Sequence, residues 1–196
     1  MEIINGHEVE FDELNHAYYV DGIRVLSVSQ ICKLENQEMY LGVDQQTLNN
    51  AARKGQGLHK TLELYEQEGI IDHRSQELSN YIEIKKKLNL KMQHTERMVL
   101  IEIDGKVVCA GRFDLMGTIE GIPALIDFKR TSQIHHNYVK LQLNLYALGL
   151  KQSYGDIVSK LMMIRLRFNE VDVVPFDIDE DYALSVLRKY VKHDAV

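Results

Sequence analysis

Two aspartates and a lysine are concentrated in the segment GRFDLMGTIEGIPALIDFKR, residues 111–130. Carboxylate oxygens are the ligands that Mg²⁺ and Mn²⁺ prefer in proteins. A lysine two residues after an aspartate lies on the same face of a strand, where it can stabilise negative charge that develops during a reaction. Asp114, Asp127 and Lys129 therefore form a candidate site for metal-assisted hydrolysis. The alternative is an ordinary ion pair on a solvated sheet face.

A hairpin would bring the two aspartates together. Glu120-Gly121 separates two strand-like runs, and a two-residue turn at that point pairs residue 119 with residue 122. The same register sets Asp114 opposite Asp127, with Cβ atoms about 5 Å apart. Two carboxylates opposed in a half-buried sheet repel each other unless a cation or a proton intervenes. We therefore expect a cation between them, and we expect neutralisation of Asp127 to leave the metal-free fold at least as stable.

Strict alternation of side chains predicts which residues accompany this pair. Phe113 and Leu115 are expected to share one apolar face of their strand, with Asp114 on the opposite face. On the following strand, Asp127 and Lys129 are expected to share a charged face. Each strand would then have one apolar side for the core and one side for chemistry.

The remaining sequence predicts an α/β fold in which a mixed central β-sheet is flanked by helices, after an N-terminal β-hairpin. We expect one domain over residues 1–196, made of a lead-in at 1–43, a core at 44–177 and a closing helix at 178–196. The hairpin spans 7–28 around Asp21-Gly22, and the other predicted elements are a short helix capped by Ser27 or Ser29 that runs to about Leu34, a helix at 44–68 with Asp44 as N-cap and Gly69 as stop, a helix at 72–90, strands at 93–104, 106–119 and 122–130, a helix at 135–151, strands at 157–168 and 171–177, and a helix at 179–191.

Two glycines, Gly55 and Gly57, fall inside the long predicted helix at 44–68. Glycine weakens a helix interior, so the helix is expected either to break there or to be approached closely by another backbone.

Composition narrows the class of protein. The chain has 196 residues, two cysteines outside any CxxC pair and a formal charge of −6. Two separated cysteines exclude a zinc ribbon and a four-cysteine iron–sulfur cluster. No apolar run has the length of a membrane span, and the polar start is unlike a signal peptide, so we expect a cytoplasmic protein without a membrane partner. The acidic balance disfavours a general nucleic-acid binder, although local basic clusters such as Arg53-Lys54 and Lys85–Lys87 offset it.

Several motifs resemble those of a known nuclease group. Gly111-Arg112-Phe113-Asp114, followed by Asp127-Phe128-Lys129, resembles the signature of the PD-(D/E)XK nuclease superfamily. Gln142 and Tyr146 resemble the QxxxY motif of its RecB-like branch, which includes phage exonucleases and Cas4 nucleases. The segment ending in His59 resembles the helical G-x-x-x-H element of that branch, and Glu96 resembles a glutamate found before the first strand of the meander. The resemblance covers roughly residues 51–170.

This resemblance implies a restriction-endonuclease-like core and a role for each matching residue. The catalytic group would be Asp114, Asp127, Lys129 and Gln142, and Mg²⁺ or Mn²⁺ would be bound by His59, Asp114, Asp127 and the main-chain carbonyl of Phe128. Substrate contacts are expected from Tyr146, Arg130 and Arg112, and Glu96 and Glu63 are secondary candidates. From the residues alone, His59 and Glu63 lie four apart on one helix face, and an ordinary solvated residue is the preferred interpretation of Glu63.

The implied activity is metal-dependent hydrolysis of DNA, by an exonuclease rather than an endonuclease, in recombination, repair or phage DNA processing. The implied setting is the cytoplasm of a bacterium, for a bacterial or phage-encoded protein. Cas4-type members need a cysteine-bound iron–sulfur cluster, which this chain cannot form. No P-loop is present in the sequence, so a helicase or recombination protein would be a separate partner. The alternative is a catalytically silent DNA-binding or protein-interaction domain on the same fold.

Overall fold

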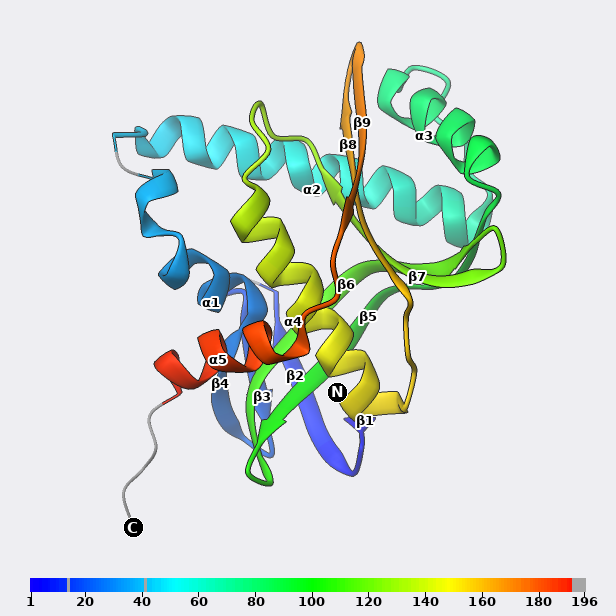
Figure 1. Cartoon of the computed structure of the whole chain (residues 1–196). Helices are drawn as coiled ribbons and strands as arrows, with labels where there is room; N and C mark the ends of the chain where they lie inside the picture. The colour runs from blue at the N-terminus through cyan, green and yellow to red at the C-terminus, as the bar shows by residue number, and fades with distance from the viewer. Residues whose placement is uncertain (14, 41, 192–196) are drawn as a thin grey trace.

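The computed structural model describes residues 1–13, 15–40 and 42–191, and these residues form an α/β structure (Figure 1). The predicted class, a mixed sheet flanked by helices, is confirmed. No helix in these ranges combines the length and apolar character needed to cross a bilayer. The elements in chain order are β1 (Glu2–Ile4), β2 (His7–Asp12), β3 (Ala17–Val20), β4 (Ile23–Ser27), α1 (Val28–Glu35), the 3₁₀ helix η1 (Gln37–Tyr40), α2 (Gln45–Glu68), α3 (Gln76–Lys87), β5 (Leu90–Ile103), β6 (Lys106–Ile119), β7 (Ile122–Lys129), α4 (His136–Tyr154), β8 (Lys160–Arg167), β9 (Glu170–Phe176) and α5 (Glu180–Tyr190).

The centre of the sheet is the antiparallel meander β5–β6–β7, to which β8 adds in parallel and β9 antiparallel. The turn between β6 and β7 has φ values of 53° at Glu120 and 82° at Gly121, as a two-residue hairpin turn requires. Ile119 pairs with Ile122, and Leu115 pairs with Ile126. The predicted hairpin register is confirmed as far as Leu115 and Ile126, but Asp114 and Asp127 are not paired as predicted, because the two strands separate at this point.

The N-terminal region is larger than the single hairpin that the sequence predicts. The hairpin around Asp21-Gly22 is present as β3 and β4, but β1 and β2 extend it to a four-stranded antiparallel meander. β4 then joins the main sheet by pairing in parallel with β6 at Cys109 and Ala110. Ser27 begins α1 through a capping box, in which its Oγ accepts a hydrogen bond from the Gln30 backbone N–H at 3.1 Å.

Helices cover both faces of the central strands. Ile126 and Phe128 of β7 pack with apolar residues of α2 and α3, and the Tyr81 ring meets the Phe128 ring edge-on at 5.2 Å. Leu125, on the other face, packs against α4 in a second cluster. The expectation of a half-buried sheet with one charged, open face is therefore wrong, because α4 covers the side that carries Asp127.

The long helix α2 agrees with its predicted boundaries. Asp44 caps it by accepting a hydrogen bond from the Thr47 N–H at 2.9 Å, and Gly69 ends it with φ at 70°. Gly55 and Gly57 do not break the helix. A Cβ added at either glycine would meet no atom within 4 Å, so no part of the described chain approaches them closely.

Other boundaries shift by a few residues. α3 begins at Gln76 rather than near residue 72, because Ser75 supplies the cap while Asp72 accepts a hydrogen bond from the Arg74 N–H in a local turn. α5 ends at Tyr190, and the part of the predicted closing helix at 192–196 lies outside the described residues.

Candidate metal centre

Asp114 lies at a fork in the sheet. One edge of β6 pairs with β5, while its other edge pairs with β4 at residues 109–110 and with β7 at residues 115–119. Between these two pairings, residues 111–114 have no strand partner on that edge among the described residues. The Asp114 side chain bridges the gap, because its Oδ2 accepts a hydrogen bond from the Phe128 backbone N–H at 2.6 Å. Where β7 separates from β6, a hydrogen bond from the Phe128 backbone to the Asp114 side chain thus takes the place of a backbone–backbone hydrogen bond between the strands.

Gly111, three residues earlier, is required by close packing of two helices. A Cβ at this position would lie 2.7 Å from Cε1 of Tyr146 on α4 and 2.8 Å from Cγ2 of Val28 on α1. Only glycine lets both helices reach β6 here. The glycine of the G-x-x-D pattern therefore has a packing reason.

Gly111→Ala is expected to destabilise the fold by about 1–3 kcal/mol, because the added methyl group must displace Tyr146 or Val28. Urea denaturation followed by circular dichroism measures the loss. Gly57→Ala is the matched control, since its methyl group projects into open space and should not lower stability. Equal stabilities for the Gly111 variant and the wild type would contradict the packing described above.

His59 reaches the fork from α2. Its Nε2 lies 3.0 Å from the carbonyl oxygen of Phe128, and its Nδ1 lies 3.4 Å from Oδ1 of Asp114. Leu58 and Leu62, on the same helix, are buried against the sheet and fix the position of this turn. The predicted histidine, aspartate and Phe128 carbonyl are therefore neighbours in space.

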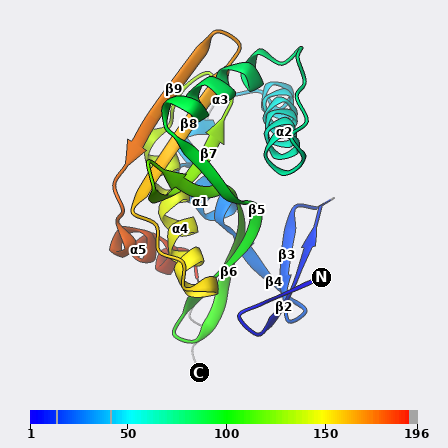
Figure 2. The same cartoon turned by 90° about the vertical axis from the view of Figure 1, so that its right-hand side faces the viewer.

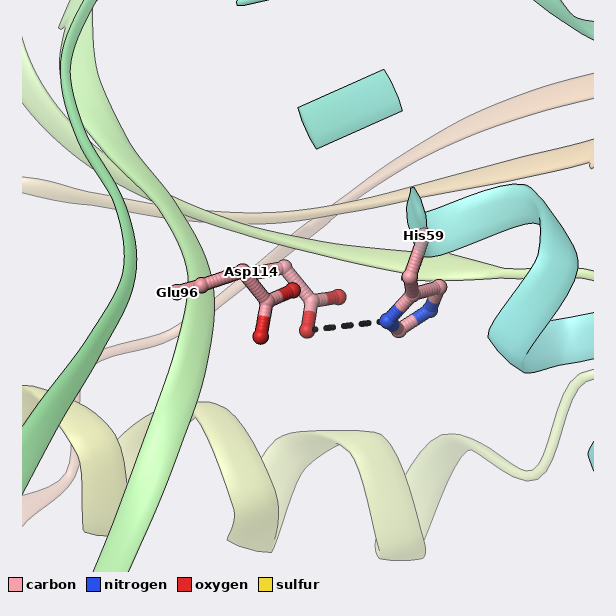
Figure 3. A group of neighbouring side chains, drawn as sticks. All are labelled: His59, Glu96 and Asp114. Carbon is pink, nitrogen blue, oxygen red and sulfur yellow. Dashed lines mark ion pairs between the residues drawn. The ribbon is translucent and has the colours of Figure 1, made fainter. Parts of the chain in front are cut away.

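Glu96 completes the group from the opposite strand (Figure 3). Thr95 pairs with Leu115 and Arg97 with Phe113, which sets Glu96 opposite Asp114. Glu96 has a left-handed φ of 49°, so β5 is irregular at this point. One donor atom each from His59, Glu96 and Asp114 lies within 4.8 Å of the others.

The same irregularity corrects the predicted faces of β6. Phe113 packs in the cluster with Met116 and Leu125, whereas Leu115 packs with Ile126 in the cluster on the other side of the sheet. Phe113 and Leu115 therefore do not share one face. The alternation is interrupted at Asp114, where its partner Glu96 departs from strand conformation and the aspartate side chain is drawn to β7.

Asp127 forms a separate, more deeply buried arrangement with Lys129 and Gln142. The Lys129 Nζ lies 2.7 Å from both carboxylate oxygens of Asp127 and donates a hydrogen bond to Oε1 of Gln142 at 2.9 Å. Asp127 is 1% exposed, and its Oδ2 makes no hydrogen bond of good geometry with any described residue. This oxygen is a buried acceptor left over for another partner.

Electrostatics set these groups apart from ordinary surface charges. Burial, reinforced by Asp114, raises the pKa of Glu96 to about 7. Burial likewise raises the pKa of Asp127 to about 6, against the opposing influence of Lys129. Burial disfavours the charge on Lys129, but Asp127 and Asp114 outweigh it and raise the pKa of the lysine. Excess negative charge at the carboxylates is thus incompletely balanced by Lys129.

The site opens into a cavity of about 400 Å³ between α2 and the N-terminal strands. Figure 2 shows α2 above β2 and β3 on the right-hand side. Tyr146 and Gln142 line this cavity from α4, and Glu63 lines it from α2, beside its ion-pair partner Lys60. Arg112 also lines it, with its Nε 2.9 Å from Oε2 of Glu96.

The predicted site residues on β7, Asp127, Phe128 and Lys129, lie behind the cavity wall and do not line it, and Arg130 lies apart from the site altogether. Its guanidinium group pairs with Glu77 of α3 at 2.8 Å. Conversely, four residues that line the cavity from the N-terminal region and α2 were not predicted as site residues. They are Phe11, His16, Tyr18 and Gln56. Only Gln56 had a sequence signal, since it lies three residues before His59 on the same helix face.

The donors present fit a divalent cation. Imidazole nitrogen and carboxylate oxygen are both common ligands of divalent cations, and the three donor atoms already converge. Two further oxygens lie on the adjoining strand β7, the Phe128 carbonyl and the Asp127 Oδ2, which is ion-paired with Lys129 but accepts no hydrogen bond of good geometry from a described residue. The arrangement can therefore hold a cation beside a buried ammonium group.

Comparisons with other proteins add little to this description. No family model matches the chain, and no curated protein matches it. Among solved structures, the crystal structure of SSO0001 aligns with 84% of this chain and 74% of its own, at 18% identity and a TM-score of 0.47. Function has to be inferred from the site itself.

Proposed function

We propose that the protein is a metal-dependent DNA nuclease of the PD-(D/E)XK type, related to the RecB-like branch. The observation that carries this proposal is a pair of groups, of which the first lines the cavity and the second reaches the cavity wall through Gln142. The first is the donor group His59, Glu96 and Asp114, and the second is Lys129 held by Asp127 and Gln142. Phosphodiester hydrolysis needs both a cation and a positioned positive charge, and this combination supplies sites for both.

In this proposal Mg²⁺ or Mn²⁺ is held by His59, Glu96 and Asp114, with Asp127 and the Phe128 carbonyl as further ligands. Such an ion, when bound, lowers the pKa of water and offsets negative charge on a phosphodiester. Glu96 was a secondary candidate from the sequence. In this proposal it becomes a principal ligand, because one of its carboxylate oxygens lies within 4.8 Å of donor atoms of His59 and Asp114.

Lys129 is the residue that we assign to the reacting atoms. An ammonium group has three protons, and Asp127 and Gln142 engage two of them. The third is available to orient the attacking water or to stabilise the negative charge that grows on the phosphate. Gln142 fixes the lysine in this position, and Tyr146, hydrogen-bonded to Gln142, lies at the cavity wall.

Arg112 is suited to binding the substrate phosphate. Its guanidinium group lies over the Phe11 ring at 4.9 Å and beside Glu96, so it is held in place at the cavity wall. DNA is the proposed substrate, a separate helicase or recombination protein is the proposed partner, and bacterial cytoplasm is the proposed setting.

Cleavage of labelled DNA in the presence of Mn²⁺ or Mg²⁺ tests the proposal. We expect degradation with either ion and none after chelation, with activity restored by adding excess Mn²⁺. Linear and covalently closed circular substrates distinguish an exonuclease from an endonuclease, and the exonuclease is expected to spare the circle. Intact DNA under all metal conditions, with DNA binding retained, would instead support a silent binding domain.

A further inference from the structure

The first half of α2, residues 45–57, carries no packing function in the described chain. All of its residues are exposed except Leu48 and Gly55, which are half-buried, and the first buried residue of the helix is Leu58. Figure 1 shows this half of α2 projecting to the left at the top of the molecule. At 1.5 Å per residue it is about 20 Å long. A helical segment of this length is marginal without tertiary contacts, so its presence calls for another role.

The charged side chains of α2 are arranged against the helix dipole, with basic residues ahead of the acidic residues along the helix. No carboxylate occurs between the N-cap Asp44 and Glu63, whereas Arg53, Lys54 and Lys60 fall within that interval. The acidic residues of the helix are all at its C-terminal end. A helix is stabilised by anions near its start and cations near its end, so this arrangement does not serve helix stability. In a chain with a net charge of −6, it creates a local cationic surface.

Two of these cations, Arg53 and Lys54, are available to a ligand, whereas Lys60 is paired with Glu63. Neither Arg53 nor Lys54 forms an ion pair with any residue that the structure describes, and the Arg53 guanidinium contacts only the Asn50 side chain, at 3.3 Å. By contrast, Arg97, Arg130 and Arg165 each pair with a carboxylate.

A continuous polar stripe leads along this helix into the cavity. Side chains three or four residues apart lie on one helix face. The stripe made by this spacing ends at two residues that line the cavity, and its members are Gln45, Asn49, Arg53, Gln56 and Lys60. Gly57, four residues after Arg53, lies on the same face, and open space surrounds it. A glycine with no protein neighbour on an exposed helix face allows a ligand backbone to approach closely.

We propose that residues 45–57 of α2 bind the phosphate backbone of a single DNA strand and guide it into the cavity. This inference rests on the proposed nuclease function. A single strand is favoured over a duplex because the donors are recessed: the Asp114 and Glu96 side chains are 10% and 18% exposed. An unpaired strand can enter such a recess, and a cationic groove that follows its backbone is the usual means of binding it.

Binding of fluorescein-labelled oligo-dT, followed by anisotropy over a range of salt concentrations, tests the inference. All variants carry Asp114→Asn, so that no cleavage is needed and failure of the nuclease proposal leaves the measurement intact. Arg53→Ala/Lys54→Ala is expected to weaken binding about tenfold and to reduce the slope of log Kd against log salt by about 1.4, the value for two phosphate contacts on single strands. Lys86→Ala/Lys87→Ala removes the same charge from exposed positions on α3 and should leave the slope unchanged.

A second variant separates strand binding from general electrostatics. Gly55→Ala/Gly57→Ala keeps every charge and is expected to raise the melting temperature, yet to weaken oligo-dT binding through loss of close approach. Equal effects of the α2 and α3 double variants would overturn the inference. Tighter binding of a blunt hairpin duplex than of oligo-dT would overturn the assignment to a single strand.

Discussion

Asp114→Asn is expected to lower metal-dependent cleavage by at least about 10³-fold while leaving the fold intact. Asn retains an oxygen that can accept the Phe128 N–H, so the bridge across the fork survives. It loses the negative charge that the donor group needs. The electrostatic contribution of a bound ion is worth several kcal/mol, and about 4 kcal/mol corresponds to this factor in rate.

Single-turnover cleavage of end-labelled DNA measures the loss. A thermal-shift titration supplies a second readout, because a cation that binds only the folded protein raises its melting temperature. Mn²⁺ should stabilise the wild type and should have a much smaller effect on the variant. Full activity in Asp114→Asn would remove Asp114 from the proposed metal ligands, whatever the fate of the fold.

Asp127→Asn is expected to destabilise the metal-free protein by about 3 kcal/mol, in addition to abolishing cleavage. Lys129 is largely buried, with 17% of its side chain exposed, and Asp127 is its carboxylate partner at 2.7 Å. Removing one member of a buried ion pair leaves the other charge uncompensated. For a domain of this size, the loss corresponds to a fall of about 6–12 °C in Tm.

The double variant Asp127→Asn/Lys129→Met is the matched control. It removes both charges, so much of the lost stability should return while cleavage stays absent. Chemical denaturation of both variants without metal provides the comparison. If Asp127→Asn alone were as stable as the wild type, repulsion between Asp114 and Asp127 would dominate over the pair with Lys129.

The sequence alone led us to expect that Asp127→Asn would leave the metal-free fold at least as stable, whereas the structure leads us to expect a loss of stability. The turn dipeptide Glu120-Gly121 is a local signal, and it correctly predicts the hairpin register as far as Leu115 and Ile126, where the pairing ends one residue before Asp114 and Asp127. Which helix covers a face of the sheet is not a local property. Because α4 covers Asp127 and brings Gln142 to Lys129, an ion pair expected at the surface becomes a buried one.

In the candidate site, features that depend on residues close in sequence could be predicted, and features that depend on contacts between distant segments could not. Capping residues such as Asp44 and Ser27 act within four residues, and they were predictable. The irregular backbone of Glu96 and the wall formed by Phe11 and His16 depend on segments far apart in the chain. Spacing alone could therefore identify Asp114, and the resemblance added His59 and Glu96, but neither could identify what surrounds these donors.

The parallel pairing of β4 with β6 also constrains how the protein is made. Leu26 and Ser27 find their partners at Cys109 and Ala110, about 80 residues later. At a synthesis rate of about 5–20 residues per second, the N-terminal meander waits roughly 4–16 s on the ribosome before its neighbour strand exists. His59 and Gln142, on α2 and α4, are separated by a similar length of chain. A nascent chain that ends before α4 therefore has all the donors but lacks Gln142, so the contact that holds Lys129 forms only when most of the chain has emerged.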